Sequence, residues 1–281
     1  MSRAPGRPME PELPEALKGK ERLGDESKFC FGCHGGLDCF TDCCSDVNIV
    51  LTPLDVLGLA RQAGLTTREF LETHTLTPIT KELHLPVVML KMGSTPEKRC
   101  PFVRLGGADA APAGCSVYDA RPWACRMYPV AMAIPPARAG VEPQPEYFLL
   151  KDGFCHGHGA GKDWPVEEWR RDQGVLERDE LEQGFQKLVS HPWFIGGRQL
   201  DPKRLDMFFT ALYDLDSFRE FVFTTSFLTR FTVDGALVAS LKTDDHALLR
   251  FAYRWLRFAL FAEPTMERRA AAAEVAPGGH P

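Results

Sequence analysis

Two consecutive segments combine helical hydrophobic spacing with clear helix-end signals. In LTPLDVLGLARQAG, Thr52 and Asp55 fit a capping box, the intervening proline suits the first helical position, and Gly64 suits the end. A second capping box, Thr66 and Glu69, opens TTREFLETH directly afterwards. The pattern therefore predicts two short helices in succession.

Several apolar runs are too short for helices and are typical of strands. LPVVMLKM (85–92) is apolar and rich in β-branched residues. CPFVRL and GCSVYD flank a loop of glycine, alanine and proline, and YFLLKDGFC (147–155) is a further candidate. We expect a few short strands in this part of the chain.

From Asp163 onward the pattern predicts helices that begin at aspartate or proline. The last, 244–261, is apolar nearly all round except for Arg250, Arg254 and Arg257, which share one helical face. That face would suit a membrane surface or a partner. A core helix whose arginines extend to water is the expectation that we prefer.

Composition places the chain among ordinary soluble globular proteins, with 44% hydrophobic and 25% charged residues. A net charge of -5 argues against a protein built to coat nucleic acid. We see neither a secretory signal nor an apolar run that would make an integral membrane segment. These features lead us to expect a cytoplasmic protein, in a compartment where disulfides are rare.

All nine cysteines lie between Cys30 and Cys155, and four of them fall within CHGGLDCFTDCC (33–44). Such clustering indicates a disulfide knot, a metal site or a redox-active pair. The expected reducing compartment and the odd number of cysteines argue against the knot. We therefore expect a metal centre, because zinc and iron–sulfur clusters both take about four thiolates.

Adjacent cysteines usually point in different directions, so Cys43 and Cys44 fit one mononuclear site poorly. They suit a cluster or two neighbouring sites. Cys30 is either a ligand or a small buried apolar residue, and the two interpretations are equally good. Without it, eight cysteines remain, which is enough for two four-thiolate sites. The expected ligands are Cys33, Cys39, Cys43, Cys44, Cys100, Cys115, Cys125 and Cys155.

Basic residues and histidines surround these cysteines. Flanking cations would offset thiolate charge and lower thiol pKa values, whereas a histidine near a cysteine is either a ligand, a supporting donor or solvent-facing. Arg121 and Arg126, in YDARPWACRMYP (118–129), are candidates to bind a cofactor or substrate, or else to pair with the metal site. The other residues considered are Lys98, Arg99, Arg104, His34, His156 and His158.

The strings CHGGLDCFTDCC…LTPLDVLGLA and CPFV…GCSVYDARPWACRMYP resemble the YkgJ-type cysteine-cluster family of zinc- or iron-chelating CxxCxxCC proteins. The resemblance covers roughly residues 28–160. It implies metal binding through Cys43, Cys44, Cys100, Cys115 and Cys125, with Cys33 and Cys39 upstream and Cys155 downstream. The chain departs from the simple motif because three residues, not two, separate Cys39 from Cys43.

The family is also similar to the cysteine-rich part of flagellin lysine methylases, which makes a protein-modifying enzyme conceivable. No G-x-G-x-x-G loop after a strand marks a methyl-donor pocket, and the catalytic residues are unknown. Tyr118 and Tyr128 would join Arg121 and Arg126 as polar candidates.

Together these patterns predict an α+β fold, mostly α-helical, with a few short strands around a cysteine-ligated metal core. We expect a disordered tail at 1–26, a metal-binding domain at 27–160, a helical region packed on it at 161–262 and a second tail at 263–281. The expected cofactor is an iron–sulfur cluster, one or two and most simply 4Fe-4S. Zinc in an interaction module with a protein partner is the alternative.

Overall fold

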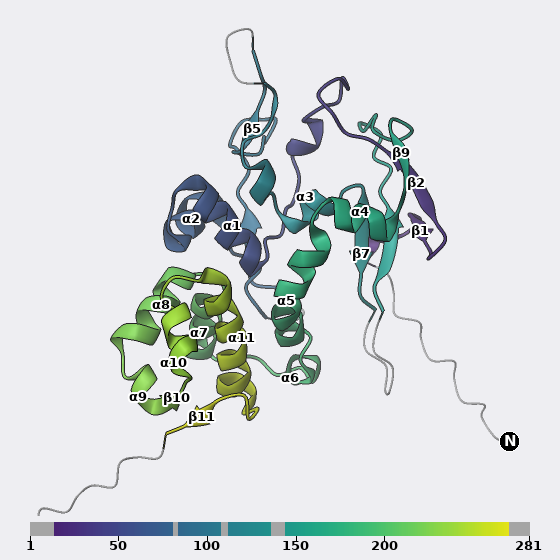
Figure 1. The fold of residues 1–281 in the computed structure, drawn as a ribbon. Helices are drawn as coiled ribbons and strands as arrows, with labels where there is room; N and C mark the ends of the chain where they lie inside the picture. Colours follow the sequence, from purple (N-terminus) through teal and green to yellow (C-terminus); the bar gives the residue numbers. More distant parts are fainter. Residues whose placement is uncertain (1–13, 81–83, 108–111, 136–143, 270–281) are drawn as a thin grey trace, which may run out of the picture. The chain divides into compact units, whose positions relative to one another are not determined.

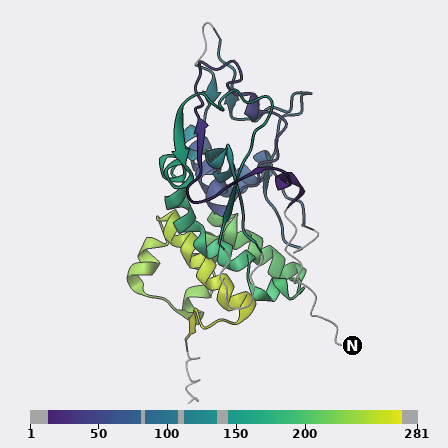
Figure 2. The same cartoon turned by 90° about the vertical axis from the view of Figure 1, so that its right-hand side faces the viewer.

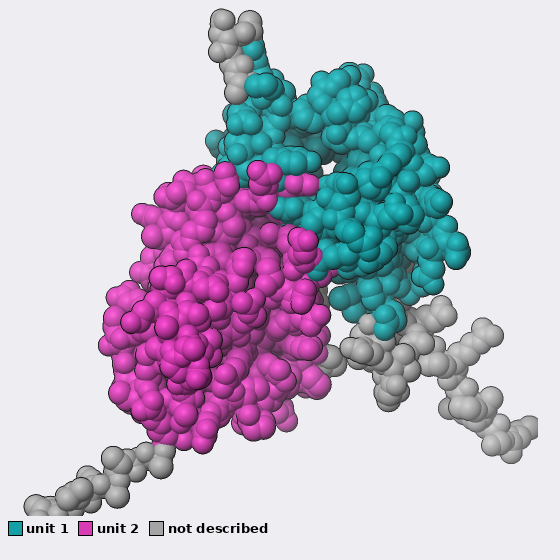
Figure 3. Space-filling model, in the orientation of Figure 1, with its two compact units in different colours: residues 1–47, 93–118, 123–176 teal, residues 48–92, 119–122, 177–281 magenta. Residues whose placement is uncertain are grey.

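The computed structural model describes residues 14–80, 84–107, 112–135 and 144–269, and its chain divides into two compact units (Figure 3). Unit 1 comprises residues 1–47, 93–118 and 123–176, and unit 2 the remainder. The described chain is mostly helical with short strands in small sheets, which confirms the predicted α+β class. None of the described helices is long and apolar enough to cross a bilayer.

Unit 1 contains short elements joined by long loops (Figure 1). A three-stranded antiparallel sheet has the order β1-β8-β7, and β2-β9 and β5-β6 form two-stranded sheets. Its strands are β1 (Glu21–Leu23), β2 (Lys28–Phe31), β5 (Val103–Arg104), β6 (Gly114–Cys115), β7 (Val130–Ala133), β8 (Glu146–Leu149) and β9 (Lys162–Pro165), and its helical segments are η1 (Glu15–Leu17), η2 (Asp42–Cys44), α3 (Trp123–Met127) and α4 (Val166–Asp172).

The core of unit 1 is a small aromatic cluster. Trp169 on α4 meets Phe29 and Phe31 of β2 edge to face, with ring centroids 5.9 and 5.6 Å apart. Its indole N–H donates to the Met127 carbonyl over 3.0 Å, so the buried polar group is satisfied. Cys155 packs against the same cluster. The aromatic residues thus connect β2 with the loop that carries this cysteine.

Unit 2 is built almost entirely of helices. In both ribbon views the last long helix, α11, runs beside neighbouring helices of this unit (Figures 1 and 2). The helices are α1 (Pro53–Ala63), α2 (Thr67–His74), α5 (Val175–Val189, of unit 2 from residue 177), α6 (Pro192–Ile195), α7 (Pro202–Leu212), α8 (Leu215–Thr224), α9 (Phe227–Arg230), α10 (Gly235–Ser240) and α11 (Asp245–Phe261); the strand pairs are β3 (Thr75–Leu76) with β4 (Met89–Leu90) and β10 (Phe231–Thr232) with β11 (Glu267–Arg268). The connecting segment η3 (Tyr118–Ala120) spans the boundary between the two sets of residues.

The local helix signals of the sequence are confirmed. Both capping boxes form, at Thr52 with Asp55 and at Thr66 with Glu69, and Gly64 ends α1 in the left-handed conformation at φ 70°. The helix expected at 244–261 is α11, and most of its apolar residues are buried. Its arginines at 250 and 254 are exposed, in agreement with the core-helix interpretation.

Two segments that we expected to be tails take part in sheets. β1, inside the predicted 1–26 tail, pairs with β8 so that Leu23 lies opposite Tyr147. β11, inside the predicted 263–281 tail, pairs with β10. These pairings join residues far apart in sequence, which local composition does not reveal. Residues 1–13 and 270–281 lie outside the described part of the chain.

Unit 2 buries an ionic cluster beside α1. Asp55 is 0% exposed, caps the Thr52 amide over 3.1 Å and pairs with Arg178 of α5. Glu182, 3% exposed, accepts the Leu54 amide over 3.3 Å. Burial, and then repulsion from Asp55, raises the pKa of Glu182 to about 8. Glu182 is therefore the protonated member of the cluster near neutral pH.

We expect the pH dependence of stability to follow Glu182. Between pH 4.5 and about 8 the unfolded chain has lost this proton and the folded chain retains it, so the free energy of unfolding falls as pH rises. Glu182→Gln should remove this pH dependence, and by pH 8 its free energy of unfolding should exceed that of wild type by on the order of 2 kcal/mol. Urea unfolding across this range measures it, with Glu177→Gln, an exposed change on the same helix, as the control. A constant difference between Glu182→Gln and wild type across the range would contradict the assignment.

Candidate metal centre

All nine cysteines lie in the described part of the chain and in unit 1, and all nine are thiols. Three segments present the eight predicted ligands: the loop and η2 at 33–44, the hairpin region at 100–125 with α3, and the loop after β8. Whether these thiols form one site or two depends on which of them are neighbours.

The first thiol set comprises Cys33, Cys39, Cys43 and Cys155. The pKa of Cys33 is raised to about 11, first by burial and then by repulsion from the other three thiols. The four thiols therefore influence one another, but no three of their sulfur atoms lie within 4.8 Å of one another among the described residues.

The second thiol set comprises Cys44, Cys100, Cys115 and Cys125. The pKa of Cys44 is raised by its hydrogen bond with Cys43 and by burial, and then by Cys43, Cys100 and Cys125. Burial first, then Cys115, raises the pKa of Cys100. Cys43 also raises the pKa values of Cys44 and Cys100, so the two sets meet at the adjacent residues Cys43 and Cys44 and are not separate there.

Short backbone pairings hold the second set. The Cys100 amide donates to the Cys44 carbonyl over 2.7 Å, and Ser45 forms a bridge with Arg99. In the β5-β6 hairpin Val103 lies opposite Cys115, as the two flanking strands in the sequence predicted. Cys125 is presented by the single turn of α3. The fold thus brings together cysteines separated by up to 81 positions in the sequence.

The first set depends on a close approach between two loops. Gly32 donates to the Gly157 carbonyl over 3.0 Å, beside a bridge between Phe31 and His158. A Cβ atom on Gly32 would lie 2.0 Å from the Ala160 carbonyl oxygen, so only glycine allows this contact. The approach brings the segment with Cys155 beside the segment with Cys33.

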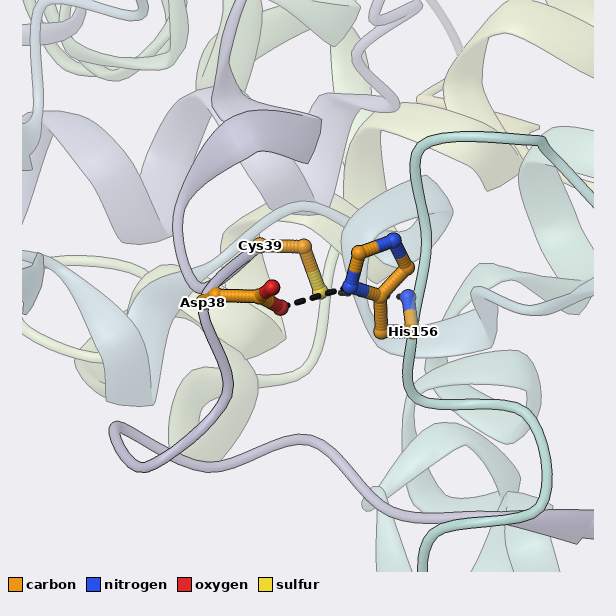
Figure 4. A group of neighbouring side chains, drawn as sticks. All are labelled: Asp38, Cys39 and His156. Atoms are coloured by element: carbon orange, nitrogen blue, oxygen red, sulfur yellow. Dashed lines mark hydrogen bonds and ion pairs between the residues drawn. The ribbon is translucent and has the colours of Figure 1, made fainter.

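An acid and a histidine accompany Cys39. Figure 4 shows Asp38 and Cys39 on one loop with His156 facing them from another. The His156 Nδ1 atom lies 2.6 Å from the Asp38 carboxylate, and the His156 amide donates to Cys39 Sγ over 3.2 Å. The pKa of Asp38 is lowered chiefly by the hydrogen bond with His156. One ligand atom from each residue lies within 4.8 Å of the others, close enough to hold a metal ion.

The other histidines near the cysteines have different surroundings. His34 accepts the Gly36 amide over 3.1 Å, which stabilises a local turn. The His158 ring meets Phe31 edge to face at 5.3 Å, and its buried Nε2 atom has no hydrogen-bond partner among the described residues. Of the three histidines considered in the sequence, His156 is the one that lies with a cysteine in a compact donor group.

Cys30 belongs to neither set. It lies on β2, and its thiol is placed to donate to the Gly161 carbonyl at 3.5 Å. This contact gives Cys30 a structural role in the β2-β9 region, whose register pairs it with Asp163. Cys30 is half-buried, and whether it is a ligand stays a prediction.

The expectation that basic neighbours lower the thiol pKa values is wrong for Cys33, Cys44 and Cys100, which burial and mutual repulsion raise instead. Lys98 pairs with Asp46 over 2.8 Å and Arg126 donates to the Gln173 carbonyl over 2.9 Å. These contacts satisfy the two cations elsewhere. Cys43 differs from the other three, because the Cys44 hydrogen bond lowers its pKa to about 7.

Arg121 and Arg126 lie five residues apart, on the segment that leads into α3 and on α3 itself. Arg126 lies on α3 in unit 1, and Arg121 lies among the residues assigned to unit 2. Tyr128 packs edge to face on Phe31, and burial, followed by the Cys155 thiol, raises its pKa. Cofactor binding by the two arginines stays a prediction.

Comparison with known protein families shows that residues 32–156 match a model described as "CxxCxxCC: Putative zinc- or iron-chelating domain". The similarity covers 125 of the chain's 281 residues, and we call these residues the CxxCxxCC domain after it. The matched range includes both thiol sets and begins two positions after Cys30. The family description supports metal chelation by the CxxCxxCC domain and leaves zinc or iron open. Comparisons with curated proteins and with solved structures gave no match.

The glycine at position 32 offers a test of the loop approach. Gly32→Ala places a methyl group against the Ala160 carbonyl and should destabilise unit 1 by about 3 kcal/mol. It should also reduce bound metal, because the Cys155 segment would move away. Gly153→Ala, whose Cβ atom meets nothing within 4 Å, is the matched control. Metal content and thermal unfolding of the two variants measure the effect; equal behaviour would contradict the packing argument.

Proposed function

We propose that the CxxCxxCC domain holds two metal centres, each through four thiolates. One centre takes Cys33, Cys39, Cys43 and Cys155, and the other takes Cys44, Cys100, Cys115 and Cys125. The observation that supports the proposal is that Cys39, Cys43 and Cys155 act on Cys33, whereas Cys100 and Cys125 act on Cys44; Cys43 acts on both sets and lies where they meet. Consecutive side chains serving two centres also account for an adjacent pair that one mononuclear site would not accommodate.

The chemistry of the thiols fits a bound metal. Partial burial, and then repulsion between the thiols when they ionise, raises the pKa values of Cys33 and Cys100. A metal cation supplies the missing positive charge and deprotonates coordinating thiols outright. The His156 amide adds a hydrogen bond to Cys39 Sγ, the kind of contact that tunes a metal–thiolate site.

Iron–sulfur clusters, most simply 4Fe-4S, are the centres that we favour. Thiolates alone supply four ligands for each, as such clusters require, and the cysteine count of eight supplies two clusters. Bound clusters would contribute one-electron chemistry or structural cross-linking. The domain would then act in a reducing compartment such as the cytoplasm, where the nine thiols stay reduced.

Zinc is the second candidate, because a set of four cysteines is also typical of a structural zinc site. In that case the CxxCxxCC domain is a stapled scaffold, and a protein partner would bind elsewhere on the chain. The enzyme alternative, by resemblance to flagellin lysine methylases, stays a prediction without assigned catalytic residues.

Metal analysis of protein purified without oxygen separates the candidates. The iron–sulfur proposal expects iron and acid-labile sulfide in near-equal amounts, with a broad visible absorption that bleaches on reduction. Stoichiometric zinc in a colourless protein without sulfide would overturn it and leave the zinc scaffold. Reconstitution with iron and sulfide, compared with zinc loading, provides the control for loss during purification.

Serine variants test the division into two centres. Cys43→Ser and Cys44→Ser should each remove about half of the bound metal, since each disturbs one four-thiolate set, and the double variant should lose nearly all. Cys30→Ser is the control and should retain the wild-type content. Complete loss in both single variants would instead indicate one shared centre, and loss in Cys30→Ser would make the ligand assignment wrong.

A further inference from the structure

Unit 2 contains a basic groove between α5 and α11 that the metal chemistry does not use. The helices approach closely where Gly184 faces Tyr253: a Cβ atom on Gly184 would lie 2.3 Å from a carbon of the Tyr253 ring. A cavity of about 250 Å³ lies beside this contact, lined by both helices and by Thr265. We call this cavity the α5–α11 groove.

The charges that line the α5–α11 groove are mostly positive. Lys187 from α5 and Arg250, Arg254 and Arg257 from α11 stand against one carboxylate, Glu180. The whole chain carries a net charge of -5, so this concentration of cations is local and opposite in sign. Concave sites lined by one sign of charge concentrate ligands of the other sign.

Two of the arginines are held in place by groups at the end of α11. Arg254 Nε donates to the Thr265 carbonyl over 2.6 Å, and the Thr265 hydroxyl donates back to the Arg254 carbonyl over 2.8 Å. Arg257 pairs with Glu263 at 2.5 Å. These contacts reduce the side-chain freedom that would be lost on binding a ligand.

The other two cations are unused by the protein itself. Within the described part of the chain, neither Arg250 nor Lys187 forms an ion pair or side-chain hydrogen bond, and both are exposed. A guanidinium matches the paired oxygens of a phosphate, and a lysine ammonium adds a compact charge. The groove thus combines two positioned arginines with two available cations.

We propose that the α5–α11 groove binds a compact oxyanion that carries a diphosphate group. Lys187, Arg250 and Arg254 are three cations besides Arg257, whose charge Glu263 offsets, and three positive charges exceed the charge of about −2 on one phosphate group. A cavity of about 250 Å³ is short for a peptide or a nucleic-acid strand. Every lining residue belongs to unit 2, so this site is independent of the proposed metal centres.

Calorimetric titration of the full-length, metal-loaded protein with inorganic pyrophosphate tests the proposal. Wild type should bind it more tightly than phosphate or sulfate, with affinity falling as salt rises. Arg250→Gln and Lys187→Gln should each weaken binding about tenfold, and Arg250→Lys should retain part of it. Glu180→Gln should strengthen binding, because it removes the one lining carboxylate.

Arg198→Gln is the matched control, since Arg198 is an exposed cation of unit 2 outside the groove. Circular dichroism of each variant establishes that it is folded before titration. Absence of pyrophosphate binding at millimolar concentration would overturn the proposal. Equal weakening of pyrophosphate binding in Arg198→Gln, or weaker binding in Glu180→Gln, would also overturn it. The same holds if a single-stranded oligonucleotide binds more tightly than pyrophosphate and its affinity is unchanged in Arg250→Gln.

Discussion

The peptide bond between Cys43 and Cys44 is the constraint on which the arrangement of unit 1 depends. Consecutive side chains usually point in different directions, and the neighbours of these two thiols differ in part: Cys43 repels Cys33 and Cys100, whereas Cys44 is affected by Cys43, Cys100 and Cys125. Two segments contact this region: the Cys100 amide, just before the β5-β6 hairpin, donates to the Cys44 carbonyl, and the His156 amide, in the loop after β8, donates to Cys39 Sγ.

This constraint helps to explain why unit 1 needs so little regular structure. Its β5-β6 strands are two residues long, and its hydrophobic core is one aromatic cluster around Trp169. Such elements bury limited apolar surface, and small folds of this kind commonly rely on a metal for stability. Unit 2 differs, because long amphipathic helices and a buried ionic cluster stabilise it without any cysteine.

The elements that could be predicted from the sequence are those that depend on residues close together in the chain. The capping boxes at Thr52 and Thr66, the strands flanking the loop before Cys115, and α11 all arise from local patterns, and all are confirmed. The sequence did not predict the β1-β8 pairing or the placement of Asp38 beside His156, 118 positions away. Such contacts depend on tertiary packing, and the glycine at 32 that permits the loop approach has no distinctive local signal.

The two thiol sets have unlike surroundings even though they meet at consecutive residues. The first lies near the Asp38 carboxylate and the His156 amide, which donates to Cys39 Sγ. The second is bordered by Ser45 and Arg99, whose side chains are 3.5 Å apart. Hydrogen bonds and charges near the sulfur atoms set the affinity and potential of a thiolate centre. Two centres built on one dipeptide would therefore be chemically distinct. Such a difference suits two centres with different roles better than two equivalent structural cross-links.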